Sequence, residues 1–238
     1  MMKMTRLSKA YRADAVETHA LREFSIEVGA GEFVAVTGPS GSGKTTLLNI
    51  AGLLEPFDSG QYELADADVS RLSDSARSRL RNQKIGFIFQ SFNLIPTLDV
   101  YDNVDVPLRY RRMAAAERHK RVTNALELVG LAGRMRHLPA QLSGGQQQRA
   151  AIARAIVGDP LLLLADEPTG NLDSVMAQQV LELLGQINRM GATIVMVTHD
   201  AELARRSQRN VHIVDGQVTD LSGAQRQPAQ TVARVAAD

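Results

Sequence analysis

The sequence predicts an α/β protein with a mostly parallel sheet and an inserted helical part, and three observations support this. The runs LLLLA at residues 161–165 and TIVMVT at residues 193–198 are strand-length and apolar, which is typical of strands covered on both faces. Strand-like runs alternate with helical patterns along most of the chain, as expected for parallel sheets. Residues 91–159 are rich in helical patterns instead, which indicates an inserted helical subdomain.

The first elements follow from alternation and from a glycine-rich stretch. Apolar and polar residues alternate over residues 24–28, which predicts a half-buried strand. A second strand is expected over residues 32–37, and it runs directly into the glycine-rich residues 38–43. A helix over residues 44–54 follows. Its expected apolar face consists of Leu47, Leu48, Ala51 and Leu54.

Turn and breaker residues divide the next part of the chain. We expect a turn at residues 56–60, a short edge strand within residues 61–69 and a strand over residues 85–89. In the mixed pattern that follows, Pro96 and Pro107 are expected to break regular structure. Further helices are expected over residues 114–129, 145–157 and 175–190. A hairpin turn is predicted at Asp215-Gly216.

The composition is that of a globular chain and excludes several classes of protein. Of the 238 residues, 44% are hydrophobic and 22% charged, which argues against disorder and low-complexity fibres. The formal net charge is +1, so no strong positive field predicts binding to nucleic acid. The sequence has no cysteine, which excludes disulfides, cysteine zinc sites and thiol nucleophiles.

No stretch of the sequence is expected to cross a membrane. A spanning helix needs about 20 mostly apolar residues in a row, and the strongest apolar runs here are far shorter. The N-terminus carries Lys3, Arg6 and Lys9 without an apolar segment behind them, unlike a secretory signal. We therefore expect a cytoplasmic chain, unless a partner holds it at a membrane.

One segment matches a phosphate-binding loop over its full length. The run Gly38-Pro39-Ser40-Gly41-Ser42-Gly43-Lys44-Thr45 fits G-x-x-x-x-G-K-[ST], and Thr46 follows it. The glycines let the backbone curl, so that its N–H groups and the following helix N-terminus bind phosphate oxygens. Lys44 is expected to reach the β- and γ-phosphates, and the Thr45 hydroxyl to ligate Mg²⁺.

Two acids and a histidine follow the two most apolar strands. Asp166 and Glu167 come directly after residues 161–165, and His199 comes after residues 193–198. Ligands gather at the carboxyl ends of parallel strands, so Asp166 is expected to hold Mg²⁺ through water and Glu167 to act as general base. His199 is expected to contact the γ-phosphate or the attacking water. Taken alone, these residues are also compatible with a solvated acidic pair and a neutral histidine at strand ends.

A second candidate anion site lies at the start of another expected helix. Ser143, Gly144 and Gly145 precede Gln146 there. Exposed N–H donors and the helix dipole at such a start can bind phosphate. An ordinary serine N-cap is the alternative interpretation of the same residues.

Together these motifs resemble the nucleotide-binding subunit of ABC transporters. LSGGQ at residues 142–146, shortly before LLLLADEP at residues 161–168, is characteristic of ABC ATPases, and the similarity extends over about residues 4–218. The resemblance implies a P-loop NTPase fold with a RecA-like core, a small antiparallel β subdomain and an inserted α-helical subdomain. It also implies a transport-coupled ATPase that uses ATP and Mg²⁺.

The resemblance also implies how the chain is divided. One ATP-binding domain is expected over residues 1–220, with the core and β subdomain at residues 1–90 and 159–220. The helical subdomain is expected at about residues 91–158. Residues 221–238 are rich in Ala, Gln and Arg without a clear period, so we expect a loose or marginally helical tail.

Further site residues are implied by the resemblance alone. Tyr11 is similar to the aromatic residue that stacks on adenine, and Gln90 to the glutamine that contacts Mg²⁺ or water and responds to the membrane partner. Asp173 is similar to the acid that crosses the interface of a head-to-tail homodimer. In such a dimer, each ATP lies between residues 38–45 of one copy and residues 143–145 of the other.

Two segments resemble one subgroup of the family more closely. Residues 89–104 and 165–174 are similar to ATPases that serve lipoprotein release, macrolide efflux and related mechanotransmission systems. This implies integral membrane permease subunits as partners, contacted through residues 90–98. Apolar side chains of residues 91–98, Phe92 and Leu94 among them, are expected to be exposed and to line a docking groove, with local packing inside the helical subdomain as the alternative. The chain is then expected to be peripheral on the cytoplasmic face of the bacterial inner membrane.

Three other functions stay open at this point. An amino-acid importer ATPase has similar residues in these segments. A soluble ABC ATPase of DNA repair or translation is disfavoured by the compact stretch between Lys44 and Ser143, by the single cassette and by the near-neutral charge. A clamp that binds nucleotide without hydrolysing it is disfavoured by the intact Glu167 and His199.

Overall fold

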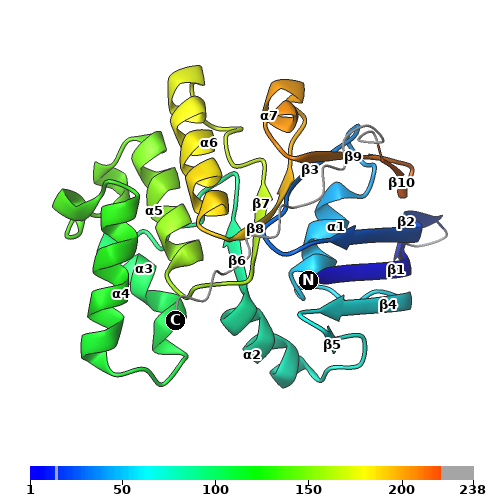
Figure 1. Cartoon of the computed structure of the whole chain (residues 1–238), viewed down its shortest axis with the longest axis horizontal. Helices are drawn as coiled ribbons and strands as arrows, with labels where there is room; N and C mark the ends of the chain where they lie inside the picture. Colours follow the sequence, from blue (N-terminus) through cyan, green and yellow to red (C-terminus); the bar gives the residue numbers. More distant parts are fainter. Residues whose placement is uncertain (14–15, 221–238) are drawn as a thin grey trace, which may run out of the picture.

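The chain folds around a six-stranded sheet whose strands run mostly parallel. The structure is a computed structural model that describes residues 1–13 and 16–220, and Figure 1 shows its elements. Every neighbouring strand pair except β9–β10 is parallel, so the predicted type of sheet is confirmed. In sheet order the strands are β10 (Gln217–Asp220), β9 (Arg209–Val214), β3 (Phe33–Thr37), β8 (Thr193–Val197), β7 (Leu162–Asp166) and β6 (Ile85–Ile88).

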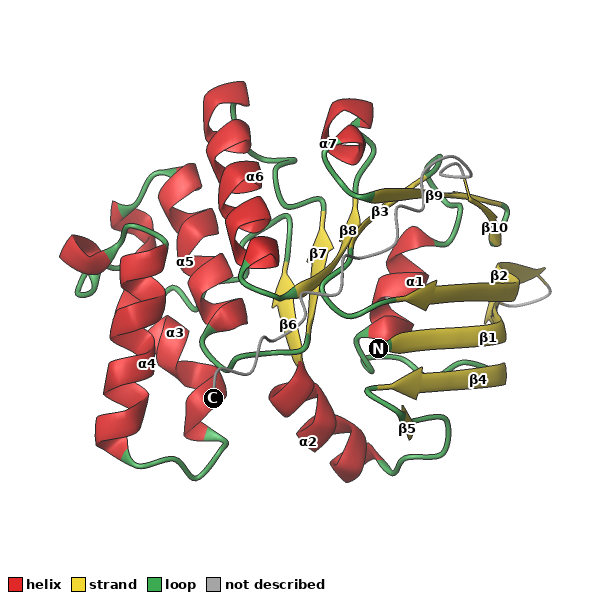
Figure 2. Cartoon of the chain, in the orientation of Figure 1, coloured by secondary structure: helices red, strands yellow, loops and turns green. Residues whose placement is uncertain are grey.

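Helices lie on both sides of this sheet (Figure 2). They are α1 (Lys44–Ala51), α2 (Asp74–Lys84), α3 (Val100–Arg109), α4 (Ala115–Leu128), α5 (Gly144–Ile156), α6 (Ser174–Arg189) and α7 (Ala201–Arg205), with 3₁₀ turns at Ala132–Arg134 and Pro139–Gln141. The helices predicted in the second half of the chain correspond to α4, α5 and α6. Neither α2 nor α7 is among the predicted helices.

The central strand β7 shows how both faces of the sheet are covered. Leu162 and Leu164 belong to a core that includes the apolar side of α1, whereas Leu163 and Ala165 belong to a second core with the apolar sides of α3 to α6. All four side chains are fully buried. The strand covered on both faces is therefore present as predicted, and α1 and α5 pack on opposite faces of the sheet.

A smaller antiparallel sheet packs beside α1 (Figure 1). In order, its strands are β2 (Val16–Val28), β1 (Met2–Ala13), β4 (Ser59–Leu64) and β5 (Ala67–Asp68). The strand β1 is not among the predicted strands. The single edge strand predicted within residues 61–69 is two strands: β4 is internal, because it pairs with β1 and β5, and the short β5 lies at the edge of the sheet. β4 also begins at Ser59, inside the predicted turn.

The helix after the glycine-rich loop is shorter than predicted. α1 ends at Ala51, because Leu53 turns into the left-handed region with φ 57°. Gly52 lies against the Phe87 ring, which a Cβ there would approach within 1.9 Å. Leu54 therefore leaves the predicted apolar face and is 47% exposed. The other three residues of that face are buried.

Pro107 lies inside α3, which corrects its prediction as a breaker. The Asp99 side chain caps this helix by accepting a hydrogen bond from the Asp102 N–H at 2.7 Å. The apolar face of α3 is fully buried and packs against α5. Its buried apolar residues are Val100, Val104 and Leu108. This burial outweighs the one hydrogen bond that proline cannot donate.

Two expectations about the whole chain have different outcomes. In the ranges that the structure describes, no helix is both long and apolar enough to cross a membrane. The expected tail, residues 221–238, lies outside the described residues.

Tyr62 links the antiparallel sheet to α1. Its side chain is fully buried in β4, and its hydroxyl donates a 2.7 Å hydrogen bond to the Ala51 carbonyl.

We predict that Tyr62→Phe lowers the free energy of unfolding by about 1–3 kcal/mol, because the buried Ala51 carbonyl loses its donor. Urea unfolding measures this change. Tyr110→Phe is the control, since Tyr110 is 78% exposed. An unchanged urea midpoint for Tyr62→Phe would contradict the prediction.

Candidate active site

The carboxyl ends of four neighbouring parallel strands meet at one edge of the large sheet. Val36 in β3 pairs with Val197 in β8, and Val197 pairs with Asp166 in β7, so these strands end at one level. Ile88, the last residue of β6, pairs with Ala165 of β7. The loops that start side by side at this edge carry Gly38, Gln90, Glu167 and His199. Their grouping agrees with the expectation for strand ends in a parallel sheet.

The phosphate-binding loop lies between two other backbone segments that leave no room for side chains. A Cβ at Gly38 would come within 2.1 Å of the Ile213 carbonyl oxygen, and one at Gly43 within 2.2 Å of the Ala20 carbonyl oxygen. Gly43 also has φ 102° and is the N-cap residue of α1. Close backbone approach therefore requires glycine at both ends of the loop.

Lys44 and the loop hydroxyls lie at the first turn of α1. Lys44 is mostly buried, and its ammonium donates to the carbonyls of Gly38 and Pro39 at 2.9 and 2.7 Å. Ser42 is also buried, and its hydroxyl has no hydrogen-bond partner among the described residues. The exposed residues of the loop are Pro39, Ser40, Gly41 and Thr45. The loop therefore presents a buried cation and an exposed hydroxyl within one helical turn.

Glu167 and His199 contact each other directly. Oε1 of Glu167 lies 3.0 Å from Nδ1 of His199. Glu167 has φ 43°, a left-handed conformation uncommon for this residue type, and its N–H donates to the Val197 carbonyl at 3.0 Å. The sequence predicts both residues at this edge but not their contact.

The surroundings of Asp166 change the pKa of its carboxyl. Burial raises the pKa of its carboxyl, and the charge of Glu167 raises it further, whereas Lys44 acts in the opposite direction. The ionised form of Asp166 is therefore less favourable here than in water. A bound cation would offset this cost, because it favours the charged form of a neighbouring carboxylate.

Gln90 is held against the segment that follows Glu167. Its backbone carbonyl accepts a 3.0 Å hydrogen bond from Asn171 Nδ2, and its side-chain amide donates to Asn171 Oδ1 at 3.5 Å. A Cβ at Gly170 would come within 2.6 Å of Gln90 Nε2, so the Gln90 side chain lies directly on the Gly170 backbone. The sequence does not identify this pairing, which joins segments 81 residues apart.

The loop after Gln90 has a strained backbone that Arg154 supports. Phe92 and Asn93 have φ 61° and 51°, in the left-handed region. This region costs a residue such as phenylalanine about 1–2 kcal/mol, whereas asparagine adopts it more readily. The Arg154 guanidinium, from α5, donates to the carbonyls of Phe92 and Asn93 at 2.8 and 2.5 Å. A hydrogen bond to a charged group contributes about 1.5–3 kcal/mol, so the pair can offset the strain.

Asn103 of α3 fixes the other end of this loop. It is fully buried, accepts a hydrogen bond from the Ile95 N–H at 2.7 Å and donates to the carbonyls of Ile95 and Leu98 at 3.1 and 3.0 Å. The prediction that Phe92 and Leu94 are exposed is corrected: both are half-buried, and Leu94 packs against the core that includes α5. Ile95 is exposed instead, at 41%.

The second candidate anion site is the N-terminus of α5. The Ser143 hydroxyl accepts from the Gln146 N–H at 3.4 Å, and Gln146 Oε1 accepts from the Ser143 N–H at 3.0 Å, which forms a capping box. The N-cap, one of the two interpretations, is therefore present. Within the described part of the chain, no hydrogen bond or ion pair joins residues 143–146 to residues 38–46. One chain does not bring the two sites together.

Tyr11 and Asp173, identified by resemblance alone, lie beside different helices. The Tyr11 hydroxyl donates to Glu55 at 2.8 Å and lies 3.4 Å from the Thr46 hydroxyl, which places it beside the first turn of α1. Burial raises the pKa of Tyr11, so its hydroxyl remains a donor at neutral pH. Asp173 caps α6 by accepting from the Met176 N–H at 2.9 Å.

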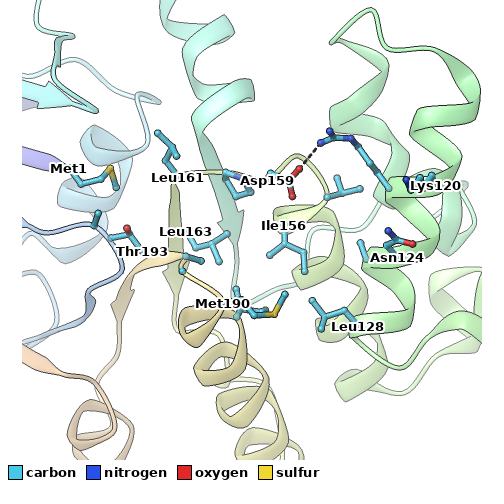
Figure 3. Close-up of a pocket in the computed structure, with 18 of the residues that line it drawn as sticks. Met1, Lys120, Asn124, Leu128, Ile156, Asp159, Leu161, Leu163, Met190 and Thr193 are labelled. Carbon is cyan, nitrogen blue, oxygen red and sulfur yellow. Dashed lines mark hydrogen bonds and ion pairs between the residues drawn. The ribbon is translucent and has the colours of Figure 1, made fainter. Parts of the chain in front are cut away.

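A cavity of about 720 Å³ lies at the opposite edge of the sheet, where β7 and β8 begin (Figure 3). Ile156, Leu163 and Met190 contribute to its largely apolar lining, as Figure 3 shows. Asp159 at this cavity forms an ion pair with Arg121 at 2.6 Å. None of the predicted site residues, all of which are described, lines it. The candidate active site is therefore the edge where the four loops start.

Comparisons with known proteins assign the chain to a family. Residues 21–170, more than half of the chain, match the family model described as ABC transporter. The chain belongs to the ABC transporter family. One relative of this ABC protein is YvrO of Bacillus subtilis, an uncharacterised ABC transporter ATP-binding protein, 45% identical over 92% of this chain and 95% of its own length. Another ABC transporter ATP-binding protein, from Thermotoga maritima, is 47% identical over 93% of this chain and 94% of its own length.

Other ABC relatives are longer or have solved structures. The macrolide export ATP-binding/permease protein MacB of Marinobacter nauticus is 43% identical over 97% of this chain, which spans 36% of MacB. The solved dimer of MJ0796, a bacterial ABC transporter cassette, matches with a TM-score of 0.85 and 40% identity, over 94% of this chain and 100% of the cassette. The same cassette in a post-hydrolysis state, with ADP and Pi bound, matches equally well.

These matches confirm the predicted fold and family. The chain is an ATP-binding subunit of an ABC transporter, and its reaction is the hydrolysis of ATP. The MacB relatives agree with the predicted subgroup, which includes macrolide efflux.

We predict that Asp166→Asn stabilises this ABC ATPase in the absence of nucleotide, in a pH-dependent way. The pKa of Asp166 is raised in the folded chain, so folding favours the protonated form and the stability falls as the pH rises through the raised pKa. Asparagine stays neutral. The Tm of the variant should therefore equal that of the parent at low pH and exceed it at higher pH. Thermal unfolding from about pH 3, below the ordinary pKa of an aspartate, to about pH 8 measures the difference.

Glu63→Gln is the control for this experiment, because Glu63 is exposed on β4. It should follow the parent at every pH. A Tm difference for Asp166→Asn that is absent throughout, or that grows as the pH falls, would contradict the prediction.

Proposed function

We propose that two copies of this ABC ATPase close head-to-tail around two ATP molecules and thereby drive a membrane permease of an export, lipoprotein-release or mechanotransmission system. The observation that carries the proposal is that residues 38–46 and residues 143–146 begin helices on opposite faces of one sheet. A second copy can supply the missing half of each phosphate site. The dimeric form of the related cassette supports this, and MacB supports the class of partner.

In this proposal the triphosphate is bound from both sides. The N–H groups of residues 38–46 and the Lys44 ammonium bind it in one copy. Residues 143–145 of the other copy bind the γ-phosphate through the start of α5, and Asp173 lies at the interface between the copies. Tyr11 stacks on the adenine, a role supported by its place beside the first turn of α1.

Hydrolysis then proceeds by attack of water on the γ-phosphorus. Glu167 accepts a proton from this water, while the bond from the γ-phosphorus to the bridging oxygen of ADP breaks. His199, in contact with Glu167, orients that carboxylate and hydrogen-bonds to the γ-phosphate. Gln90 helps hold the attacking water. Loss of the γ-phosphate, which connects the two copies, reopens the dimer.

The donors at this edge fit Mg²⁺. The Thr45 hydroxyl, the Gln90 amide oxygen and the Asp166 carboxylate are hard oxygen donors, and their loops start at one sheet edge. No group of three or more His, Cys, Asp or Glu side chains among the described residues could hold a metal. This agrees with a cation that is bound largely through phosphate oxygens and water. Bound Mg²⁺ would neutralise charge on the phosphate oxygens.

We predict that Glu167→Gln keeps its affinity for ATP but lowers kcat by at least about 100-fold, because an amide cannot accept the proton. With ATP and Mg²⁺, the variant should accumulate as a dimer, which light scattering after size-exclusion chromatography would detect. Lys44→Ala in the same background is the control and should stay monomeric, since it loses ATP. Full turnover by Glu167→Gln would exclude Glu167 as the base. An ATP-bound monomer would exclude the closed dimer.

We also propose that the permease contacts residues 90–98 and the groove beside them. Clamping by Arg154 and Asn103 presents Ile95 on a rigid loop, which favours a surface that recognises one partner shape. The chain is then held at the cytoplasmic face of the membrane by this contact. The helical subdomain at residues 91–158 carries the loop and α5 together, so the division of the chain forms part of this proposal.

The groove beside this loop has a volume of about 1210 Å³ and a basic lining. Its floor includes Phe87 and Phe89, whose rings stack 5.5 Å apart. Among the described residues that line it, five are arginines and none is acidic. Arg79 and Arg112 are exposed and form no ion pair within the described part of the chain. The arginines are Arg79, Arg81, Arg111, Arg112 and Arg154. This lining fits a permease segment that carries acidic and apolar residues.

We predict that the double substitution Arg79→Glu and Arg112→Glu weakens capture of the permease at least about tenfold, because it reverses the charge of the groove. Tagged Glu167→Gln protein with ATP and Mg²⁺ would be recovered from gently solubilised native membranes, and the membrane protein bound to it quantified. Lys3→Glu with Arg22→Glu, exposed on the antiparallel sheet, is the charge-matched control. Equal recovery by both double variants would contradict the groove as the contact.

A further inference from the structure

Arg154 is a half-buried arginine that lines the groove described above and is not among the residues predicted for the active site. It lies in α5, the helix that begins after Ser143, and its guanidinium bridges two consecutive carbonyls at 2.8 Å (Phe92) and 2.5 Å (Asn93). These carbonyls belong to the loop that begins directly after Gln90. One side chain therefore joins the helix of the second phosphate site to the loop of a predicted catalytic residue.

The surroundings of Arg154 are unusual for a cation. Among the described residues no carboxylate pairs with it, and its partners are backbone carbonyls 61 and 62 residues away in sequence. Burial lowers the pKa of the guanidinium, although arginine stays charged at neutral pH. Both carbonyls lie in left-handed backbone, and a planar guanidinium with several donors can reach both at once. An ammonium, a compact charge, is less suited to bridging them.

The same loop contacts the start of α5 as well. A Cβ at Gly144 would lie 3.8 Å from the Phe92 ring and 3.6 Å from Leu172. The ring of Phe92 thus lies against the first turn of α5, near the segment that holds Gln90 through Asn171. A displacement of α5 would therefore be transmitted to the Gln90 loop at two points. One is the apolar contact of Phe92 with the first turn of α5, and the other is the polar contact of Arg154.

We propose that Arg154 is a positioning residue for Gln90: it holds the loop at residues 91–93 to α5, so that Gln90 is correctly placed when α5 docks against bound ATP. The proposal rests on the proposed role of Gln90 in hydrolysis. It assigns to Arg154 no contact with ATP. Its effect appears in the rate of hydrolysis and in the protection of the loop backbone.

The first test is the steady-state ATPase rate of the full chain. Arg154→Met should lower kcat at least about tenfold while the KM for ATP–Mg²⁺ changes less than about twofold, because a misplaced catalytic group affects the rate more than binding. Arg154→Lys should lie between Met and the parent, since it keeps the charge but not the bridge. Arg149→Met is the control, because Arg149 lies in the same helix and its side chain forms no hydrogen bond or ion pair among the described residues. An unchanged kcat for Arg154→Met would overturn the proposal.

A double-mutant cycle with Gln90→Ala separates positioning from general damage. If Arg154 acts through Gln90, adding Arg154→Met to Gln90→Ala should not lower kcat further. If the two effects multiply, Arg154 acts independently of Gln90 and the proposal is wrong. If Gln90→Ala alone leaves kcat unchanged, the proposed role of Gln90 in hydrolysis fails. If Gln90→Ala lowers kcat but Arg154→Met does not, the role of Gln90 stands and the proposal for Arg154 fails.

Hydrogen exchange gives a result that does not depend on turnover. In Arg154→Met, the backbone amides of residues 91–95 should exchange at least about tenfold faster than in the parent, while the amides of α5 keep their protection. The same measurement on Arg154→Lys applies should the methionine variant fail to fold. Unchanged exchange of this loop in both variants would overturn the proposal.

Discussion

Four neighbouring parallel strands must end at the same level for this ABC ATPase to work. Val36, Val197 and Asp166 are paired across β3, β8 and β7, and the loops that follow these strands carry the chemistry. Leu162, Leu164 and Asp166 share one face of β7, the face toward α1. A slip of β7 by one residue would bury the leucines in the wrong core and turn Asp166 away from Lys44. The apolar residues on both faces of the sheet thereby fix the place of the charged ones.

The two cores also explain how distant parts of the site communicate. α1 packs on one face of the sheet and α5 on the other, so the two candidate phosphate sites share no packing interface. Their connections run instead through the loops at the sheet edge, where Asn171 holds Gln90 and Arg154 holds the following turn. These are polar contacts of a few side chains. They can rearrange at much lower cost than the packing of either core.

The sequence predicts most of the candidate site but only part of the fold, for physical reasons. A phosphate-binding loop is a local motif whose chemistry lies in consecutive residues, so residues 38–45 can be recognised without knowing their surroundings. Strand β1 is harder to predict, because its register shifts between Met4 and Leu7 and Arg6 has φ 48°, which interrupts the alternation. Helix α2 has only Ala76 and Leu80 as apolar residues, too few to show an apolar period, although its Ser73 cap is a usable signal. The role of Arg154 has no sequence signal, since its partners are backbone carbonyls far away in the chain.

The close packing of glycines in the phosphate-binding loop decides how short a fragment of this protein can be and still form the loop. Gly38 lies against the Ile213 carbonyl and Gly43 against the Ala20 carbonyl, and the Gly216 N–H donates to the Ser42 carbonyl at 3.1 Å. The family model covers residues 21–170, which excludes Ala20, Ile213 and Gly216. A fragment cut at those limits would keep every residue of the motif and lose the walls that shape it. The motif is continuous in sequence, but the binding loop is an assembly of three chain segments.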